Sequence, residues 1–325
     1  MMKLPFRHLA AAAKGGASAG VVIRQGAVEL LALQGSKVTT RIRVPVEGKD
    51  EPHLTAAIQK AVEAANLKTK KLPVAFSTQD VLFRFFTMPA VPKAEWDTAV
   101  QFEVRKYIPF KTDTLVWDYV VLDAGASGKL EVIFAAMQRD AFEKIHNALT
   151  AARVQPTLME PRSLSLARLV ESAPGRSSGA FVCLVDVDGP TAHLAIVKNG
   201  VPYLARDLVL PAANDRPADA VADAPSAIDP QAQRLLSELS VSIDFFTREY
   251  PSAGIVSVWL FGDEQLIRPW CQWFSDQLRC PVDVGAALID RLIDGGLPTS
   301  FASAVGLLKA QRGRAGSILN FLRRS

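Results

Sequence analysis

Two short segments of the chain carry the residue types of catalytic motifs. Gly16-Ala-Ser-Ala-Gly20 matches the G-x-S-x-G pattern, in which a serine hydroxyl is the nucleophile, and Gly125-Ala-Ser-Gly-Lys129 resembles the end of a phosphate-binding loop. The first pattern works where a strand turns sharply into a helix, but here it precedes an expected strand. The second lacks the earlier glycine and joins two expected strands. We therefore predict neither a nucleophilic Ser18 nor a P-loop.

Histidine and cysteine show no spacing typical of a metal site or a catalytic pair. The histidines are never paired at i+3 or i+4, and His193 is expected to be a partly exposed strand residue. The cysteines are too few and too irregular for a disulfide framework or a zinc site, which favours a reducing compartment. We predict no catalytic residue and no metal ion. The histidines are His8, His53, His146 and His193, and the cysteines are Cys183, Cys271 and Cys280.

The composition is that of a folded protein with room for two domains. The chain has 325 residues, of which 49% are hydrophobic and 22% charged, with a net charge of +4. Because Lys and Arg are spread among almost as many acids, we expect no nucleic-acid partner. We find no apolar stretch long enough to cross a bilayer and no signal peptide in the sequence, so we expect a cytoplasmic protein.

The hydrophobic pattern predicts two α/β units that open with the same three-strand rhythm. The first has strands at 20–24, 27–33, 38–46 and 72–76 and a helix at 54–65. The second has strands at 181–187, 192–198, 203–210 and 256–260 and helices at 230–250 and 266–278, and a last helix is expected at 301–308. Asn199-Gly200 is expected to be a hairpin turn.

A block with a different rhythm interrupts the first unit and is expected to be an inserted subdomain. It has strands at 81–88, 115–122 and 130–137 and helices at 93–108 and 140–152. The predicted organisation is an arm (1–19), a first lobe (20–80, 156–174 and 299–312), the inserted subdomain (81–155), a second lobe (178–298) with a mobile loop (211–230), and a tail (313–325).

The end of the first helix of the subdomain has apolar residues that its buried stripe does not explain. Phe102 lies off the stripe, and Ile108 and Phe110 lie at and just beyond the proline stop, where they are expected to be exposed. Hydrophobic residues at such a place often contact another surface. Either a joint between subdomains or a groove for a partner would account for them.

This segment, Glu103-Val-Arg-Lys-Tyr-Ile-Pro-Phe110 followed by Trp117-Asp-Tyr119, resembles the PilM family, the cytoplasmic actin-like proteins of type IV pilus machines. The resemblance extends from Gly20 to about Leu308. It implies an α/β, actin-like (ribonuclease H-like) fold of two lobes, with an FtsA-like subdomain inserted in the first lobe and a nucleotide cleft between the lobes. FtsA and the cytoplasmic part of GspL share this fold, so a related secretion or division adaptor is an alternative.

The first phosphate loop of such a fold departs from the family pattern. Val22 stands where the family has an acid, Arg24 where it has a glycine, and Glu29 where it has a basic residue, with Gly26 in the same turn. Losing the tight turn removes backbone N–H groups that would bind phosphate, and Glu29 would repel a triphosphate.

The other nucleotide motifs depart as well. In the second phosphate loop Asp186 is kept but Asp188 replaces a glycine, and the glycine-rich adenosine turn is reduced to Gly262. Phosphoryl transfer needs positioning and metal in place together. We expect weak or no binding of ATP and Mg²⁺ and no hydrolysis, the alternative being a working ATPase of the same family.

The resemblance also implies a partner. PilM-type proteins bind the short cytoplasmic N-terminal segment of PilN, an inner-membrane protein, in a groove associated with the inserted subdomain. We expect the same here, together with a link to the pilus motor ATPases, so that the chain is a scaffold peripheral to the inner membrane. The groove candidates are Phe102, Lys106, Tyr107, Ile108 and Phe110.

The tail offers three interpretations, all of them open from the sequence. Leu319-Asn-Phe-Leu322 resembles the I-N-L-L core of the PilN peptide, so the tail could enter the same groove in its own or a neighbouring molecule, the latter being self-association. Its apolar residues with two arginines could instead anchor it at a membrane surface, or the tail could be disordered. The contact candidates are Ile318, Leu319, Asn320, Phe321 and Leu322.

Overall fold

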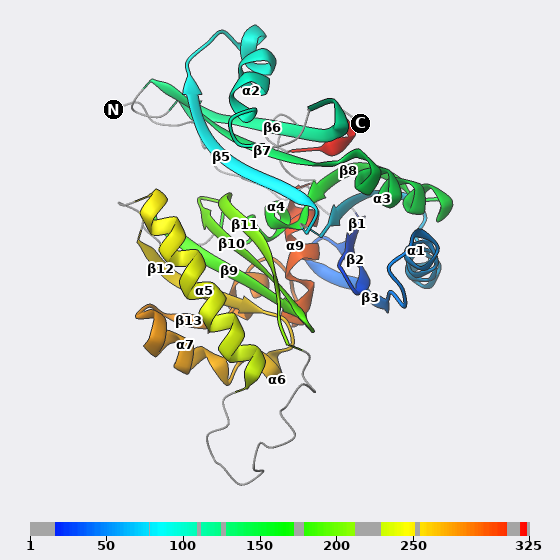
Figure 1. Ribbon diagram of the computed structural model, residues 1–325. Coiled ribbons are helices and arrows are strands. Elements are labelled where there is room, and N and C mark those ends of the chain that lie inside the picture. Colours follow the sequence, from blue (N-terminus) through cyan, green and yellow to red (C-terminus); the bar gives the residue numbers. More distant parts are fainter. Residues whose placement is uncertain are drawn as a thin grey trace.

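The computed structural model places two lobes side by side and a smaller subdomain across one end (Figure 1). The residues that it describes are 17–77, 79–108, 112–124, 128–171, 179–211, 229–250, 254–310 and 319–323. Each lobe is built on one five-stranded sheet, and the subdomain on a sheet of three strands.

The sheets of the two lobes have the same topology. The first has the order β3-β2-β1-β4-β8 and the second the order β11-β10-β9-β12-β13. In each, three antiparallel strands are followed by two parallel ones. The strands of the first sheet are β1 (Ala17–Ile23), β2 (Ala27–Gln34), β3 (Lys37–Pro45), β4 (Lys71–Phe76) and β8 (Gln155–Pro161). Those of the second are β9 (Phe181–Asp188), β10 (Thr191–Lys198), β11 (Val201–Val209), β12 (Ile255–Phe261) and β13 (Val282–Val284).

Corresponding helices make the crossovers that parallel strands require. In the first lobe α1 (Glu51–Ala65) connects β3 to β4, and in the second α5 (Pro230–Glu249) connects β11 to β12. Both helices begin with an aspartate cap followed by a proline in the first turn. The second lobe also carries α6 (Glu264–Ile267), α7 (Trp270–Leu278) and α8 (Ala286–Asp290).

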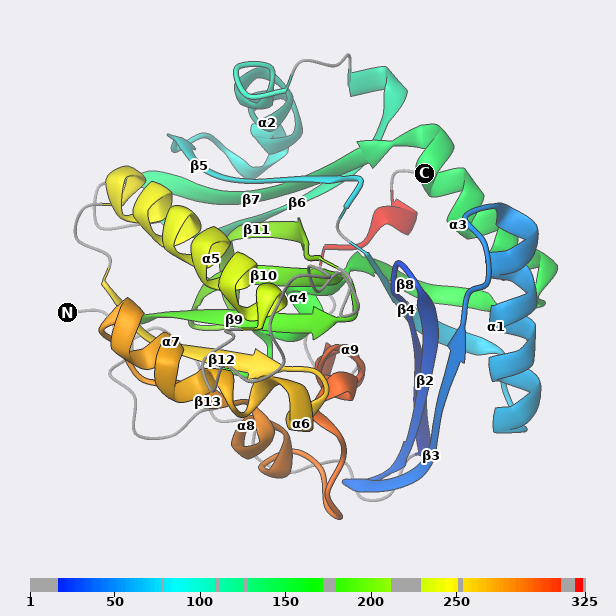
Figure 2. The same cartoon turned by 60° about the horizontal axis from the view of Figure 1, so that its bottom comes forward.

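Two helices lie between the lobes and hold them together (Figure 2). They are α4 (Arg162–Ala167) and α9 (Ala302–Ala310). A Cβ at Gly306 would lie 1.7 Å from the carbonyl oxygen of Ser165, so the two helix backbones touch there. Their apolar side chains form one core with residues of both sheets, among them Val22 and Leu184.

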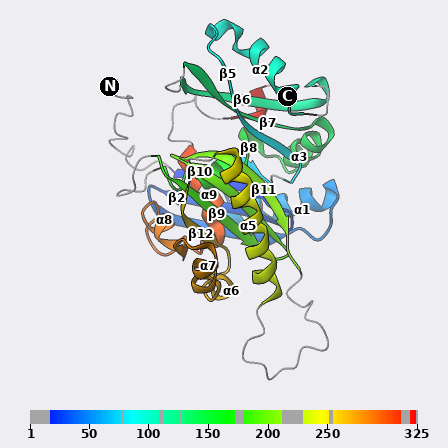
Figure 3. The ribbon, with the colours of Figure 1, turned by 60° about the vertical axis from the view of Figure 1, so that its left-hand side comes forward.

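The inserted subdomain stands at one end of the molecule (Figure 3). Its sheet has the order β5-β7-β6, with α2 (Trp96–Val104) packed on one face. The other face joins the core of the first lobe, together with α3 (Arg139–Ala151). The strands are β5 (Val81–Pro89), β6 (Leu115–Ala124) and β7 (Lys129–Gln138). Phe85 also stacks on Tyr203 of the second lobe, with ring centroids 4.1 Å apart.

Several predicted boundaries need correction. Strand β1 begins at Ala17, so residues 17–19 of the predicted arm belong to the sheet, and residues 1–16 lie outside the described part. Strand β8 was not predicted because its two prolines break the alternation. The helix expected at 266–278 is divided into α6 and α7 at Pro269, which has no N–H to donate. Most of the predicted loop 211–230, residues 212–228, lies outside the described part.

The turn predicted at Asn199-Gly200 is confirmed, since both residues have positive φ, 53° and 78°. Among the described helices, none combines the length and apolar character that crossing a bilayer requires.

Candidate functional site

Arg24 follows strand β1 and reaches from the first lobe to the second. Its Nε lies 2.8 Å from Glu29 Oε1, and its Nη1 lies 2.9 Å from Asp186 Oδ2 and 3.8 Å from Asp188 Oδ2. Its Nη2 donates to the carbonyl oxygen of Ser300. Because Arg24 is only 2% exposed, its charge depends on these partners rather than on water.

Two more arginines extend this arrangement. Arg43 on β3 lies 2.5 Å from Glu29 and also pairs with Asp188. Arg162, at the start of α4, lies 3.7 Å from Asp186 Oδ2, to which Ser303 Oγ also donates at 3.2 Å. We call these side chains the interlobe ion cluster: Arg24, Glu29, Arg43, Arg162, Asp186 and Asp188.

In the interlobe ion cluster, burial disfavours the charged form of each side chain, whereas the opposite charges beside it favour that form. Burial would lower the pKa of Arg24, but the carboxylates of Asp186, Glu29 and Asp188 outweigh burial and raise this pKa. Burial raises the pKa of Glu29 despite Arg24 and Arg43. For Asp188, burial acts to raise the pKa, and the two arginines outweigh it and lower the pKa. Each charge is therefore tolerated only with its partners present.

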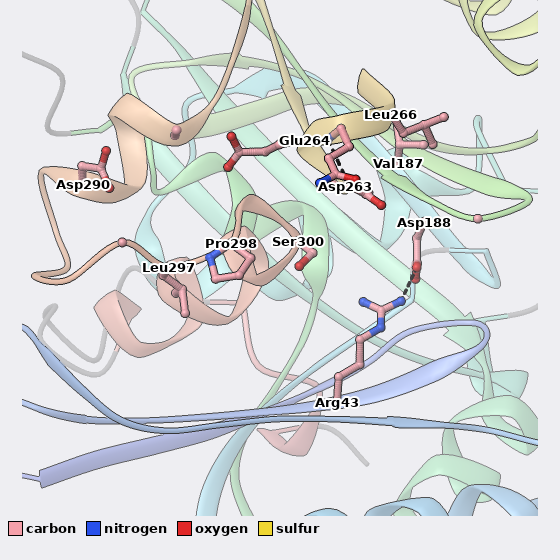
Figure 4. Close-up of a pocket in the computed structure, with 15 residues that line it drawn as sticks. Arg43, Val187, Asp188, Asp263, Glu264, Leu266, Asp290, Leu297, Pro298 and Ser300 are labelled. Atoms are coloured by element: carbon pink, nitrogen blue, oxygen red, sulfur yellow. Dashed lines mark hydrogen bonds and ion pairs between the residues drawn. The ribbon is translucent and has the colours of Figure 1, made fainter. Parts of the chain in front are cut away.

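A cavity of about 800 Å³ lies beside the interlobe ion cluster (Figure 4). Arg43 is the only basic residue among those described along its wall. The acidic residues of the wall are Asp188, Asp263, Glu264 and Asp290. The excess of carboxylates makes this cavity unsuited to a polyanion.

His193, predicted to be partly exposed, is fully buried beside the cluster. Its Nδ1 lies 2.6 Å from Asp207 Oδ1, and Asp207 also accepts from Ser77 Oγ at 3.0 Å. Strand β10 lies between β9 and β11, and α4 packs against it, which removes the His193 side chain from water. Arg162 and Asp186 are the other charged groups that act on the imidazole.

Burial lowers the pKa of His193, although the bond to Asp207 acts in the opposite direction. The unfolded chain therefore binds a proton near pH 6.5 before the folded protein does, and stability falls as pH falls, by at most about 1.4 kcal/mol per pH unit. Urea unfolding at pH 7.5 and about pH 5.5 should show a smaller loss for His193→Asn than for the unchanged chain. Equal losses would contradict this prediction.

The tail residues 319–323 lie in a groove between two sheet edges. One edge is β8 of the first lobe, and the other is β6 of the subdomain. Met159 N–H on β8 donates to Asn320 Oδ1 at 3.0 Å, and Asn320 N–H donates to Asp118 Oδ2 on β6 at 2.8 Å. Met159 and Asp118 both belong to edge strands, which have no further strand on that side.

Apolar contacts fill the same groove. Leu319 is 1% exposed and Phe321 is fully buried. The Phe321 ring lies 5.5 Å from the ring of Phe76 on β4 and 6.4 Å from that of Phe142 on α3, measured between centroids. We define the tail groove by Phe76, Asp118, Phe142 and Met159. The described part of the tail is thus ordered against the protein, and its two buried apolar residues are withdrawn from any membrane surface.

The tail groove differs from the groove that the sequence predicted, because Leu319 and Phe321 pack on the face of the subdomain sheet that joins the first lobe, whereas α2 covers the other face. The candidates on α2 and just after it also do not share one environment. Phe102 is 64% and Tyr107 45% exposed, and Lys106 lies over the Phe102 ring at 5.7 Å. Ile108 was predicted to be exposed but is buried, because its N–H bonds back to Val104 O at 3.1 Å and turns the chain toward the subdomain core. Phe110 and, in the tail, Ile318 lie outside the described residues.

A family model described as type IV pilus assembly protein PilM matches residues 33–210 of the chain. The chain belongs to the PilM family. A solved PilM–PilN type IV pilus biogenesis complex contains a chain with 19% sequence identity and a TM-score of 0.74, and the match covers 91% of this chain and 99% of that one. The cytoplasmic domain of EpsL, an inner-membrane component of the type II secretion system of Vibrio cholerae, matches with 10% identity, 94% and 98% coverage and a TM-score of 0.55. A search of curated proteins found no match.

These similarities show that the fold is actin-like, as predicted. An actin-like PilM fold implies a nucleotide between the lobes, but the residues of this chain do not fit a triphosphate. The guanidinium of Arg24 is buried and already paired with Glu29 of the first lobe and Asp186 of the second. Gly262 is required by the backbone itself, since at φ 138° a Cβ would lie 2.6 Å from the Val187 carbonyl oxygen. Within the described residues, no group of three or more His, Cys, Asp or Glu side chains is arranged so that it could hold a metal ion.

The structure brings together only part of the predicted nucleotide positions in this PilM chain. Arg24, Glu29, Asp186 and Asp188 meet in the interlobe ion cluster, whereas Val22 packs in the core between the lobes. Gly26 lies in the exposed turn and accepts a bond from Val46 N–H. Sequence reasoning missed Arg43, Arg162 and Asp118. Of these, Asp118 had a signal, since it is the central residue of Trp117-Asp-Tyr119.

Proposed function

We propose that this chain is a cytoplasmic scaffold of a type IV pilus assembly machine, peripheral to the inner membrane, which binds a short N-terminal peptide of a PilN-like membrane partner and links it to the assembly motor. The tail groove is the observation that supports this proposal. It holds an apolar–Asn–apolar–apolar segment through one side-chain amide and two buried apolar residues, and that is the kind of peptide expected of the partner.

We further propose that the scaffold acts without nucleotide hydrolysis. The interlobe ion cluster supports this reading, because Arg24 is paired with Glu29, Asp186 and Asp188 at positions where phosphate and Mg²⁺ would need free donors and ligands. The acidic wall of the adjacent cavity also opposes binding of a polyanion.

Phe102, Lys106 and Tyr107 remain candidates for a second contact with the same partner. Exposed aromatic residues beside a cation are common in protein interfaces. Ile108 is buried in the subdomain core, so a charged substitution there would damage that core rather than test binding.

Fluorescence anisotropy tests the proposed function directly. The probe is a labelled synthetic peptide with the cytoplasmic N-terminal residues of the PilN-like protein of the same organism. It should bind the full chain saturably, and Phe102→Ser, at a ring that is 64% exposed, should weaken binding while changing the free energy of unfolding by less than about 0.5 kcal/mol. Val209→Ser, at a 73% exposed valine of the second lobe, is the matched control. Absence of binding, even with the tail displaced, would refute the proposed partner.

A further inference from the structure

The last described residues of the chain have the contacts of a bound peptide rather than those of a sheet or core helix. Only one turn, Phe321–Arg323, is helical, and it packs against β6 and β8. Asn320 Oδ1 accepts both from Met159 N–H of the groove and from Leu322 N–H of the tail itself, at 3.0 and 3.1 Å. The Asn320 side chain therefore both stabilises the turn of the tail and binds the tail to the groove.

We propose that residues 319–323 are an intramolecular competitor that occupies the tail groove of its own molecule and must leave before a partner peptide can enter. This inference rests on the proposed function only in naming the displacing ligand, a peptide of a PilN-like protein with the same apolar–Asn–apolar–apolar pattern. The regulated site is the tail groove itself.

The contacts that recognise the tail would serve another peptide of the same pattern equally well. Two of the three backbone and amide bonds described above join the segment to the groove, and neither depends on the identity of an apolar side chain. Asp118 is nearly buried and lies 3.5 Å from Arg323, so a basic residue after the motif is favoured. Leu319 and Phe321 supply the apolar anchors.

The segment is also suited to release. A single helical turn has little stability of its own and relies wholly on the groove. Its release would uncover Phe76 and Phe142, but residues 319–323 form no strand of any sheet, so opening is a local event that leaves the strands paired. While it is bound, its covalent attachment gives it a high effective concentration, and a free peptide binds correspondingly more weakly.

The test uses the full chain, with a protease site introduced between residues 311 and 318 so that the tail can be cut after folding. The probe is a labelled synthetic peptide of residues 317–325. Before cutting, it should bind weakly or not at all. After cutting, its affinity should rise by about tenfold or more as the severed tail exchanges. The uncut double variant Asn320→Ala with Phe321→Ser should show the same gain, and Val209→Ser should show none.

Each outcome decides the proposal. Equal probe binding before and after cutting, or no binding by a cut protein whose circular dichroism and melting are unchanged, would refute a displaceable tail. Association of the uncut chain into dimers that the double variant no longer forms would refute occupancy within one molecule.

If the tail probe behaves as expected but the PilN-like peptide never competes with it, the competitor stands and the proposed partner is wrong. If only the PilN-like peptide binds, and equally well in cut and uncut chains, the partner stands and the competitor is refuted.

Discussion

Replacing Arg24 by methionine is expected to lower the free energy of unfolding by about 3–5 kcal/mol, as is typical when one member of a buried ion pair is removed. Methionine keeps much of the volume but leaves Asp186 without its closest cation and Glu29 with Arg43 alone. Since the lost contacts join the lobes, thermal melting should also become less cooperative. Urea unfolding followed by far-ultraviolet circular dichroism measures the effect.

Arg43→Met is the matched control for this prediction. Arg43 makes the same kinds of contact, with Glu29 and Asp188, but 36% of its side chain is exposed. Water can replace part of its lost partner interactions, so its removal should cost clearly less than that of Arg24. A loss for Arg24→Met no larger than that for Arg43→Met would mean that the interlobe ion cluster does not stabilise the lobe interface.

Asp118→Asn is expected to weaken peptide binding to the tail groove by about 10- to 100-fold, the range for a hydrogen bond to a charged group. The substitution keeps the shape of the side chain but removes the charge that accepts from Asn320 N–H and attracts Arg323. The measurement is anisotropy with the peptide of residues 317–325, in the background of Asn320→Ala with Phe321→Ser, where the attached tail does not compete.

Asp113→Asn, at an exposed carboxylate just before β6, controls for the loss of one negative charge in the same subdomain. It should leave the peptide dissociation constant within about twofold, since an exposed charge contributes little. If Asp118→Asn behaves like this control, the peptide contacts a different surface.

The repeated lobes were predictable because their strands and helices carry complete local signals. Three apolar strands with tight turns open each lobe, and an amphipathic helix follows at the corresponding place in both. The sheet order could not be read from the same pattern, because pairing of β4 with β8 joins residues separated by the whole subdomain. Nor did the sequence show β8, whose prolines are tolerated at the edge of the sheet.

The site was predicted in part for a similar reason. The replacement of family residues at Arg24 and Glu29 indicated that the phosphate loop had changed, but nothing local indicated that these side chains pair with each other and with Asp186. Burial of Ile108 depends on a chain reversal after the helix, which the helical period does not describe. The burial of Leu319 and Phe321 depends on two sheet edges that come together only in the folded protein.

The most direct test of the proposed nucleotide-free scaffold is titration of the full chain with fluorescently labelled ATP in the presence of Mg²⁺, together with an assay of phosphate release. With Arg24 paired between Glu29 and Asp186 and the adjacent cavity lined by carboxylates, we expect neither saturable binding at micromolar concentrations nor hydrolysis. Saturable binding in the low micromolar range, with an ordered adenine nucleotide between the lobes, would contradict the proposal that the scaffold acts without nucleotide.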